Sequence, residues 1–219
     1  MGSPENYDIA LKHKKRVQDR YTVFEFERPD GFTFTPGQYG VFKHINKAVN
    51  GRKVRAFSLA MKQDEDLIRI ATRIEAPVSD FKQHLDALTY GDKLTMQAPV
   101  GNFTIVDPSP AVFLVGGIGI TPVYSMALSH PVLDKTLVYS ELDHIYPFKE
   151  ELEQIDHLTI HYTSGVEPTQ HAIKEVVNTH SDALYYVVGS PNFVNGIKAF
   201  LNELGVNPKQ IFNDSFSGY

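Results

Sequence analysis

Cysteine is absent from this sequence of 219 residues. Its absence excludes disulfides, a thiolate-ligated zinc site, a cysteine nucleophile and any iron–sulfur cluster held by these residues. No apolar run approaches the ~18 residues that a membrane span requires. The first residues also lack a charged start followed by an apolar stretch. We therefore expect no membrane span, no signal peptide and a cytoplasmic location.

A surplus of positive charge is missing too, since 21 Lys and Arg face 26 Asp and Glu, for a formal net charge of −5. Nucleic acid is therefore not an expected partner. The balance of 42% hydrophobic and 21% charged residues is that of a globular protein. Nine histidines are scattered, and the pair spaced four apart, His157 and His161, falls on a loop and a strand, so we expect no metal site.

The first 107 residues predict an antiparallel β-barrel, because short strand-like runs follow one another with turn-forming residues between them. In the first of these runs Thr22, Phe24 and Phe26 share one face. One helix interrupts the strands, with Ser79 as its expected N-cap and an end near Leu88. The expected strands are residues 21–27, 39–45, 53–61, 67–74 and 93–98.

Residues 108–219 predict an α/β domain with a five-stranded parallel sheet, because strand-like and helix-like segments alternate. The run from Ala111 to Val115 is apolar throughout, as in a strand covered on both faces. The expected strands are residues 111–115, 136–139, 158–162, 184–188 and 210–213, and the expected helices are residues 122–129, 147–154, 169–178 and 191–204.

Two segments are able to bind an anion. Gly116-Gly117-Ile118-Gly119-Ile120-Thr121-Pro122 joins a buried strand to a helix, where backbone N–H groups can bind phosphate, with Thr121 as the expected cap. A tight turn that binds nothing is the alternative. In Arg55-Ala56-Phe57-Ser58 the arginine can clamp a phosphate and the aromatic ring can lie on another ring system. Taken alone, that segment is also an ordinary strand.

Five motifs, in this order along the chain, resemble the ferredoxin–NADP(+) reductase family of flavin oxidoreductases. They are Pro36-Gly37-Gln38-Tyr39, Arg55-Ala56-Phe57-Ser58, Pro99-Val100-Gly101-Asn102-Phe103, the glycine segment from Gly116 to Pro122, and Tyr186-Val187-Val188-Gly189-Ser190-Pro191. The resemblance implies an FAD-binding β-barrel domain in residues 1–107 and an NAD(P)-binding α/β domain in residues 108–219.

The resemblance also assigns roles in the first domain. Arg55 is expected to contact a flavin phosphate, Phe57 to stack on the isoalloxazine, and Ser58 to act catalytically near its N5 edge. Ser79 is expected over the FAD pyrophosphate, and the remaining flavin contacts are expected from Ala56 and Thr72. Ala76-Pro77-Val78 replaces the family's glycines before Ser79, so FMN stays an alternative to FAD.

In the second domain the resemblance places Gly116, Gly117, Gly119, Thr121 and Pro122 around the nicotinamide cofactor. The same role is implied for Gly189, Ser190 and Pro191. Val188 stands where the family has a cysteine. Asp214 is expected as a catalytic residue and Phe216 as a contact close to the flavin. Tyr219 is a further candidate for stacking, unless the tail faces solvent.

Acidic residues favour NADH over NADPH. Glu141 and Asp143 follow the expected second strand of the domain, where family members that use NADPH usually carry Arg or Lys. A carboxylate repels a 2′-phosphate and accepts hydrogen bonds from a ribose diol. If both acids face water, they discriminate little.

The resemblance implies hydride transfer from NADH or NADPH to FAD, followed by one-electron transfer to a separate acceptor. A ferredoxin, a flavodoxin, an oxygenase component and a small molecule are all candidate acceptors. The basic run Lys12-His13-Lys14-Lys15-Arg16, expected ahead of the first strand, is either solvated or docks an acidic partner. The alternative function is a non-catalytic sensor or structural subunit that binds flavin or nucleotide on the same fold.

Overall fold

The computed structural model describes residues 3–216. The chain divides into two units, Met1–Thr104 and Ile105–Tyr219, close to the border expected after residue 107. Each unit has its own sheet. The binding roles expected of the two domains stay predictions at this point.

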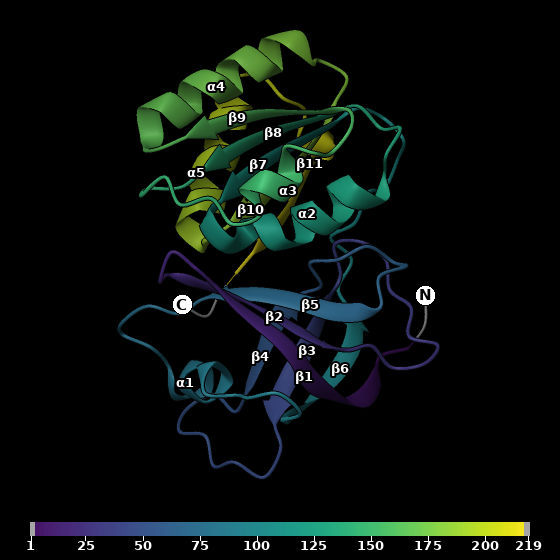
Figure 1. Ribbon diagram of the computed structural model, residues 1–219. Coiled ribbons are helices and arrows are strands. Elements are labelled where there is room, and N and C mark those ends of the chain that lie inside the picture. The colour runs from purple at the N-terminus through teal and green to yellow at the C-terminus, as the bar shows by residue number, and fades with distance from the viewer. Residues whose placement is uncertain (1–2, 217–219) are drawn as a thin grey trace. The chain divides into compact units, whose positions relative to one another are not determined.

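The first unit is built on an antiparallel half-barrel of six strands in the order β4-β3-β6-β1-β2-β5 (Figure 1). This confirms the predicted antiparallel architecture. The strands are β1 (Glu5–Val17), β2 (Tyr21–Glu27), β3 (Tyr39–His44), β4 (Val54–Ser58), β5 (Leu67–Arg73) and β6 (Lys93–Val100), and the helix is α1 (Asp80–Asp86).

Strand β1 is the element that sequence reasoning missed. Its first half pairs with β6 and its second half with β2, and the register shifts between Leu11 and His13. The basic run of residues 12–16 therefore lies within a strand, and the expectation that it precedes the first strand is wrong. In β1 only Ile9, Ala10 and Leu11 are buried, so the strand carries almost no alternating pattern.

Aromatic and aliphatic side chains fill the first unit's core. Thr22, Phe24 and Phe26 lie on the buried face of β2, as their spacing predicts. Helix α1 adds Phe81 and Leu85 to the same cluster. Both residues are fully buried and so anchor α1. The first turn of the helix lies next to the start of β4 and the end of β5.

The second unit contains a five-stranded parallel sheet in the order β11-β10-β7-β8-β9, which confirms the predicted α/β architecture. Its strands are β7 (Ala111–Gly116), β8 (Lys135–Ser140), β9 (Leu158–Thr163), β10 (Leu184–Gly189) and β11 (Ile211–Ser215). Its helices are α2 (Ile120–Ser129), α3 (Lys149–Leu152), α4 (Val166–Thr179) and α5 (Pro191–Glu203), with the short 3-10 turns η1 (Gly117–Gly119) and η2 (Pro208–Gln210).

Helices cover both faces of this sheet. α4 and α5 pack against the face that carries Val112, Leu114 and Val187, while α2 lies on the other side (Figure 1). Residues 111–115 of β7 are at most 1% exposed, which agrees with their uninterrupted apolar sequence. Within residues 3–216, no helix combines the length and hydropathy that crossing a membrane demands.

Two helix boundaries differ from expectation. α4 begins at Val166 rather than at residue 169, because Pro168 is tolerated in a first turn, where its missing N–H has no helical acceptor. α3 covers only Lys149–Leu152, a single turn, although residues 147–154 were expected to be helical.

Candidate functional site

Arg55 on β4 has a buried donor without an acceptor. Its guanidinium lies 5.7 Å from the centroid of the Phe81 ring, and one terminal nitrogen donates to the carbonyls of Arg52 and Val54, each at 3.1 Å. Its Nε is buried and forms no hydrogen bond. Burial lowers the pKa of Arg55, and the charge of Arg52 adds to that effect. Buried donors are normally satisfied, so this one points to a missing acceptor.

Ser79 carries a second unsatisfied group. It occupies the N-cap position of α1, as expected, but its side chain makes no capping hydrogen bond. The hydroxyl oxygen is instead buried without a partner. The predicted N-cap position is therefore confirmed, while the hydroxyl itself has no hydrogen-bond partner.

Lys82 is the residue at this place that no motif indicated. It lies three positions after Ser79 and so on nearly the same side of α1. Its Nζ donates to the carbonyl of Arg73 at 2.9 Å. Burial, together with the positive charges of Arg55 and Arg73, lowers the pKa of Lys82 to about 8. Positive side chains from the first turn of α1, the start of β4 and the end of β5 therefore lie near one another, which fits a phosphate ligand.

The other residues expected to contact a flavin are mostly buried. Phe57 is 8% exposed and packs against Phe42 and Phe81, with ring centroids 5.5 and 6.2 Å away. This gives it a clear role in the core, and its stacking on a flavin stays a prediction. Ser58 is buried opposite Tyr39 of β3.

Ala56 and Thr72 complete the residues expected at the flavin. Ala56 is exposed on β4, and Thr72 is buried on β5 opposite Thr22. The two lie on opposite edge strands of the sheet. Their flavin contacts stay predictions.

Two of the family-like motifs hold the end of the half-barrel together. Gln38 donates from its side-chain amide to the backbone carbonyl of Gly101 at 2.9 Å, and the backbone carbonyl of Gln38 accepts from the Leu59 N–H at 3.0 Å. Gly101 has φ +93°, and a Cβ there would lie 2.7 Å from the Tyr39 ring. These contacts fix the end of β4, where Ser58 lies.

In the second unit, the glycine segment and the segment after β10 lie at a topological switch point. β7 and β10 are neighbours, but β7 connects to β8 on one side while β10 connects to β11 on the other. Ligands of open parallel sheets bind at the carboxyl ends of such strands. Gly116 ends β7 there and Gly117 follows it, while Gly189 ends β10. Ser190 caps α5 by accepting from the Phe193 N–H at 3.3 Å, and Pro191 begins that helix.

Packing accounts for three of these glycines without a ligand. A Cβ on Gly116 or on Gly189 would lie 2.9 Å from the Phe193 ring. A Cβ on Gly119 would lie 2.7 Å from the carbonyl oxygen of Val188, so the turn rests directly on β10.

Thr121 does not cap α2, because its hydroxyl donates to the Ile118 carbonyl at 3.0 Å and Gly119 holds the N-cap position. That expectation is wrong. Pro122 is buried in the first turn.

The two acids after β8 differ in environment. Glu141 is 6% exposed, and its backbone N–H donates to the Thr163 carbonyl at 3.0 Å. Asp143 is exposed. Burial raises the pKa of Tyr146, and the negative charge of Glu141 raises it further. Glu141 is thus the acid that lies at the carboxyl end of the sheet.

The end of the described chain returns to the same switch point. The Phe216 N–H donates to the Gly189 carbonyl at 2.9 Å. Asp214 pairs in register with Val188, and burial raises its pKa, against the effect of a hydrogen bond from the Ser215 backbone N–H. Tyr219 lies outside the described residues.

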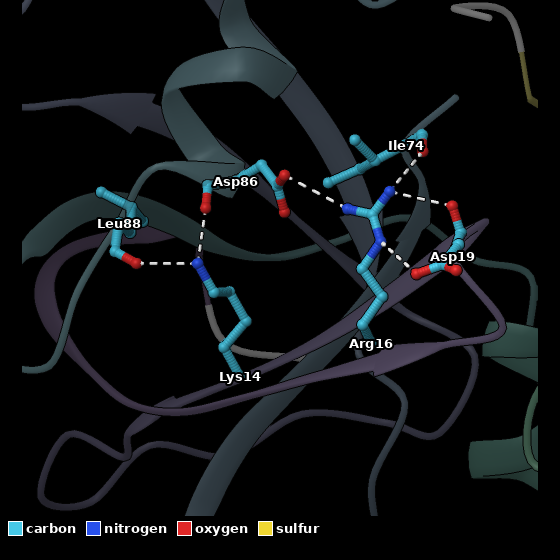
Figure 2. A network of polar contacts seen from close by, with 6 residues as sticks. All are labelled: Lys14, Arg16, Asp19, Ile74, Asp86 and Leu88. Carbon is cyan, nitrogen blue, oxygen red and sulfur yellow. Dashed lines mark hydrogen bonds and ion pairs between the residues drawn. The ribbon is translucent and has the colours of Figure 1, made fainter. Parts of the chain in front are cut away.

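The basic run of β1 serves the first unit itself (Figure 2). Lys14 donates to the carbonyls of Asp86 and Leu88 at the end of α1, at 2.5 and 3.1 Å. Arg16 donates to the Asp86 carboxylate at 3.2 Å and to the Ile74 carbonyl at 3.3 Å. These two cations anchor α1, so they do not support the expected docking role.

Across residues 3–216, no group of three or more His, Asp or Glu side chains is arranged to hold a metal ion.

No protein-family model matches the chain. Among curated proteins, it is 28% identical over 243 residues to Flavohemoprotein A of Dictyostelium discoideum, covering 98% of this chain and 61% of that protein. It is also 28% identical over 186 residues to a probable dihydroorotate dehydrogenase B (NAD(+)) electron transfer subunit of Pyrococcus horikoshii, covering 85% and 62%.

Solved structures have the same fold. The flavohem-like FAD/NAD-binding domain of nitric oxide dioxygenase from Vibrio cholerae superposes with a TM-score of 0.82 at 19% identity, covering 96% of this chain and 98% of that one. Ferredoxin–NADP+ reductase from Plasmodium falciparum gives 0.80 at 14% identity, covering 96% of each. The chain is thus similar in fold to ferredoxin–NADP+ reductase.

The chain spans only part of the length of several curated relatives. Its match covers 61% and 60% of two flavohemoproteins, from Dictyostelium discoideum and Bacillus subtilis. A flavohemoglobin from Malassezia yamatoensis, solved with bound FAD and heme, gives a TM-score of 0.78 at 18% identity, covering 97% of this chain and 60% of that one.

Proposed function

We propose that this chain is an NAD(P)H-dependent flavin oxidoreductase, which takes hydride from NADH, or less readily NADPH, and passes single electrons to a separate acceptor. The observation that carries the proposal is the pair of buried, unsatisfied polar atoms, Arg55 Nε and Ser79 Oγ. They lie at one end of a half-barrel whose relatives include a flavohemoglobin solved with FAD.

The first unit binds the flavin, and FAD is favoured over FMN. Arg55 donates to a phosphate through a planar guanidinium, which suits paired oxygens. Ser79 adds a short neutral donor, while Ser58 faces the N5 edge from the end of β4. When bound, FAD supplies the group that accepts a hydride and releases electrons singly.

The second unit binds the nicotinamide cofactor at its switch point. The N–H groups after Gly116 face a pyrophosphate, and Gly189, Ser190 and Pro191 line the neighbouring corner. Glu141 accepts hydrogen bonds from the adenosine ribose, which favours NADH. Asp214, beside this corner, is the proposed acid of the site, and its raised pKa eases protonation.

The acceptor is a ferredoxin, a flavodoxin, an oxygenase component or a small molecule. The relatives support this range, because they include a ferredoxin reductase of carbazole 1,9a-dioxygenase and a cytochrome P450 reductase from Amycolatopsis. The second candidate function is a non-catalytic flavin or nucleotide sensor. It is favoured by the departures at Ala76-Pro77-Val78 and Val188 from the family pattern.

The test is flavin content after purification, compared between the wild type, Arg55→Ala and the control Lys43→Ala. Lys43 is exposed on β3, the strand next to β4. We expect flavin in the wild type and in Lys43→Ala, and a loss of at least about ten-fold in affinity in Arg55→Ala, as for a lost charge-assisted hydrogen bond. Full flavin content in a folded Arg55→Ala variant would reject this site.

A further inference from the structure

We propose that Lys82 binds the phosphate of the flavin nucleotide together with Arg55 and Ser79. This inference rests on the proposed function and goes beyond it, since Lys82 belongs to none of the motifs that resemble the reductase family. The ligand chemistry is a phosphate carried by a flavin, and the source is either FAD or FMN.

The first turn of α1 brings the three groups together. Ser79 and Lys82 are three residues apart and share a side of the helix. Phe81, between them, packs under the Arg55 guanidinium at 5.7 Å. The arrangement is rigid, because the Phe81 side chain is fully buried and its carbonyl contacts the buried His44 imidazole at 3.0 Å.

Electrostatics favour an anion at this place. The charges that act on Lys82 belong to Arg55 on β4 and Arg73 on β5, and both are positive. Arg73 is paired with Glu75, whereas the contacts of Arg55 among residues 3–216 are two backbone carbonyls and the Phe81 ring. A bound phosphate places negative charge next to cations that otherwise repel one another.

The remaining charged groups around α1 are engaged with one another. Asp80 accepts from the Asn50 N–H at 2.7 Å and lies 3.6 Å from the His84 imidazole. His44 on β3 lies 5.7 Å from His84, ring centroid to ring centroid. Asp80 and His84 are four residues apart and so share a side of α1. Asp80 directly follows Ser79, about 100° further round the helix, so this side differs from that of Ser79 and Lys82.

A phosphate also changes the protonation of Lys82. In the flavin-free protein, burial and the charges of Arg55 and Arg73 hold the pKa of Lys82 at about 8, and a bound anion raises it again. Binding therefore takes up a proton when the pH is above 8. The affinity for FAD or FMN falls as the pH rises from 7 to 9, while riboflavin, which has no phosphate, shows no such change.

The experiment measures the Kd of FAD, FMN and riboflavin for flavin-free protein at pH 7 and pH 9. The variants are Lys82→Met, Lys82→Arg and the control Lys43→Met. For Lys82→Met we expect FAD and FMN to bind about ten-fold more weakly at pH 7, with riboflavin unchanged. Lys82→Arg keeps most of the affinity and loses the pH dependence, because arginine stays charged.

Three results would overturn the role of Lys82 while the proposed function stands. The first is wild-type affinity for FAD and FMN in Lys82→Met, with Arg55→Ala still impaired. The second is an equal loss of riboflavin binding in Lys82→Met, and the third is an unchanged pH dependence in Lys82→Arg. Either of the last two means that Lys82 only supports the backbone at Arg73. If the wild type binds none of the three flavins, the proposed function fails and the inference fails with it.

Discussion

The contact between the glycine turn and β10 gives a sharp stability prediction. In Gly119→Ala, the new Cβ would lie 2.7 Å from the carbonyl oxygen of Val188, 2.9 Å from its carbonyl carbon and 3.1 Å from the Cα of Gly189. All three atoms are backbone, and β10 is held between β7 and β11. No flexible side chain can yield, so the turn or the strand must shift.

The expected cost follows from these distances. Overpacking a rigid site costs about 1–3 kcal/mol, and contacts below 3 Å to two backbone atoms of Val188 place this one near the top of that range. Reduced freedom of the unfolded chain offsets ~0.4–1 kcal/mol. The net loss of about 1–2.5 kcal/mol corresponds to a fall in melting temperature of roughly 3–8 °C for a chain of this size.

Gly196→Ala is the matched control in the same unit. Gly196 lies inside α5, and a Cβ there meets no heavy atom within 4 Å. Alanine is the better helix former by about 0.8–1 kcal/mol, so this variant should melt slightly higher than the wild type. The assay is thermal unfolding followed by circular dichroism. Equal melting temperatures for Gly119→Ala and the wild type would refute the packing of the turn on β10.

Two further predictions concern charge. Replacing Glu141 by Gln and Asp143 by Asn should narrow the preference for NADH over NADPH in kcat/KM, because a carboxylate ~5 Å from a 2′-phosphate costs roughly 3 kcal/mol per charge pair at an effective dielectric of ~20, and less if exposed. An unchanged preference would mean that neither acid contacts the ribose. The pKa of Lys82 is lowered to about 8 in the folded protein from an ordinary value of 10.5, so its charge disfavours folding at low pH, and this penalty disappears as the pH rises from 8 to 10.5. Flavin-free wild type should therefore gain on the order of 2–3 kcal/mol over that range relative to Lys82→Met in urea unfolding, and parallel pH profiles would contradict the burial of this lysine.

The fold was predictable where residue periodicity reports burial. The alternating face of β2 and the apolar run of β7 both indicate strands directly. β1 gives no such signal, because most of its side chains are polar and several of them, such as Lys14 and Arg16, serve to hold α1. Its only cue is the short buried segment from Ile9 to Leu11.

The candidate site was predictable only in part. Local motifs indicate Arg55 and Ser79, because their residue types and spacing suit a phosphate. Lys82 has no such signal, since its role depends on Arg55 and Arg73 from two other strands. Local sequence also misassigns Thr121, whose hydroxyl donates to the Ile118 carbonyl, because Gly119, and not the threonine, holds the N-cap position of α2.

The visible spectrum of the purified protein, followed by anaerobic addition of NADH and separately NADPH, is the measurement that tests flavin-dependent hydride transfer. We expect a yellow protein that carries flavin and is bleached faster by NADH than by NADPH. A colourless protein that also fails to bind added FAD and FMN would contradict this expectation, and would favour a non-catalytic role for this fold.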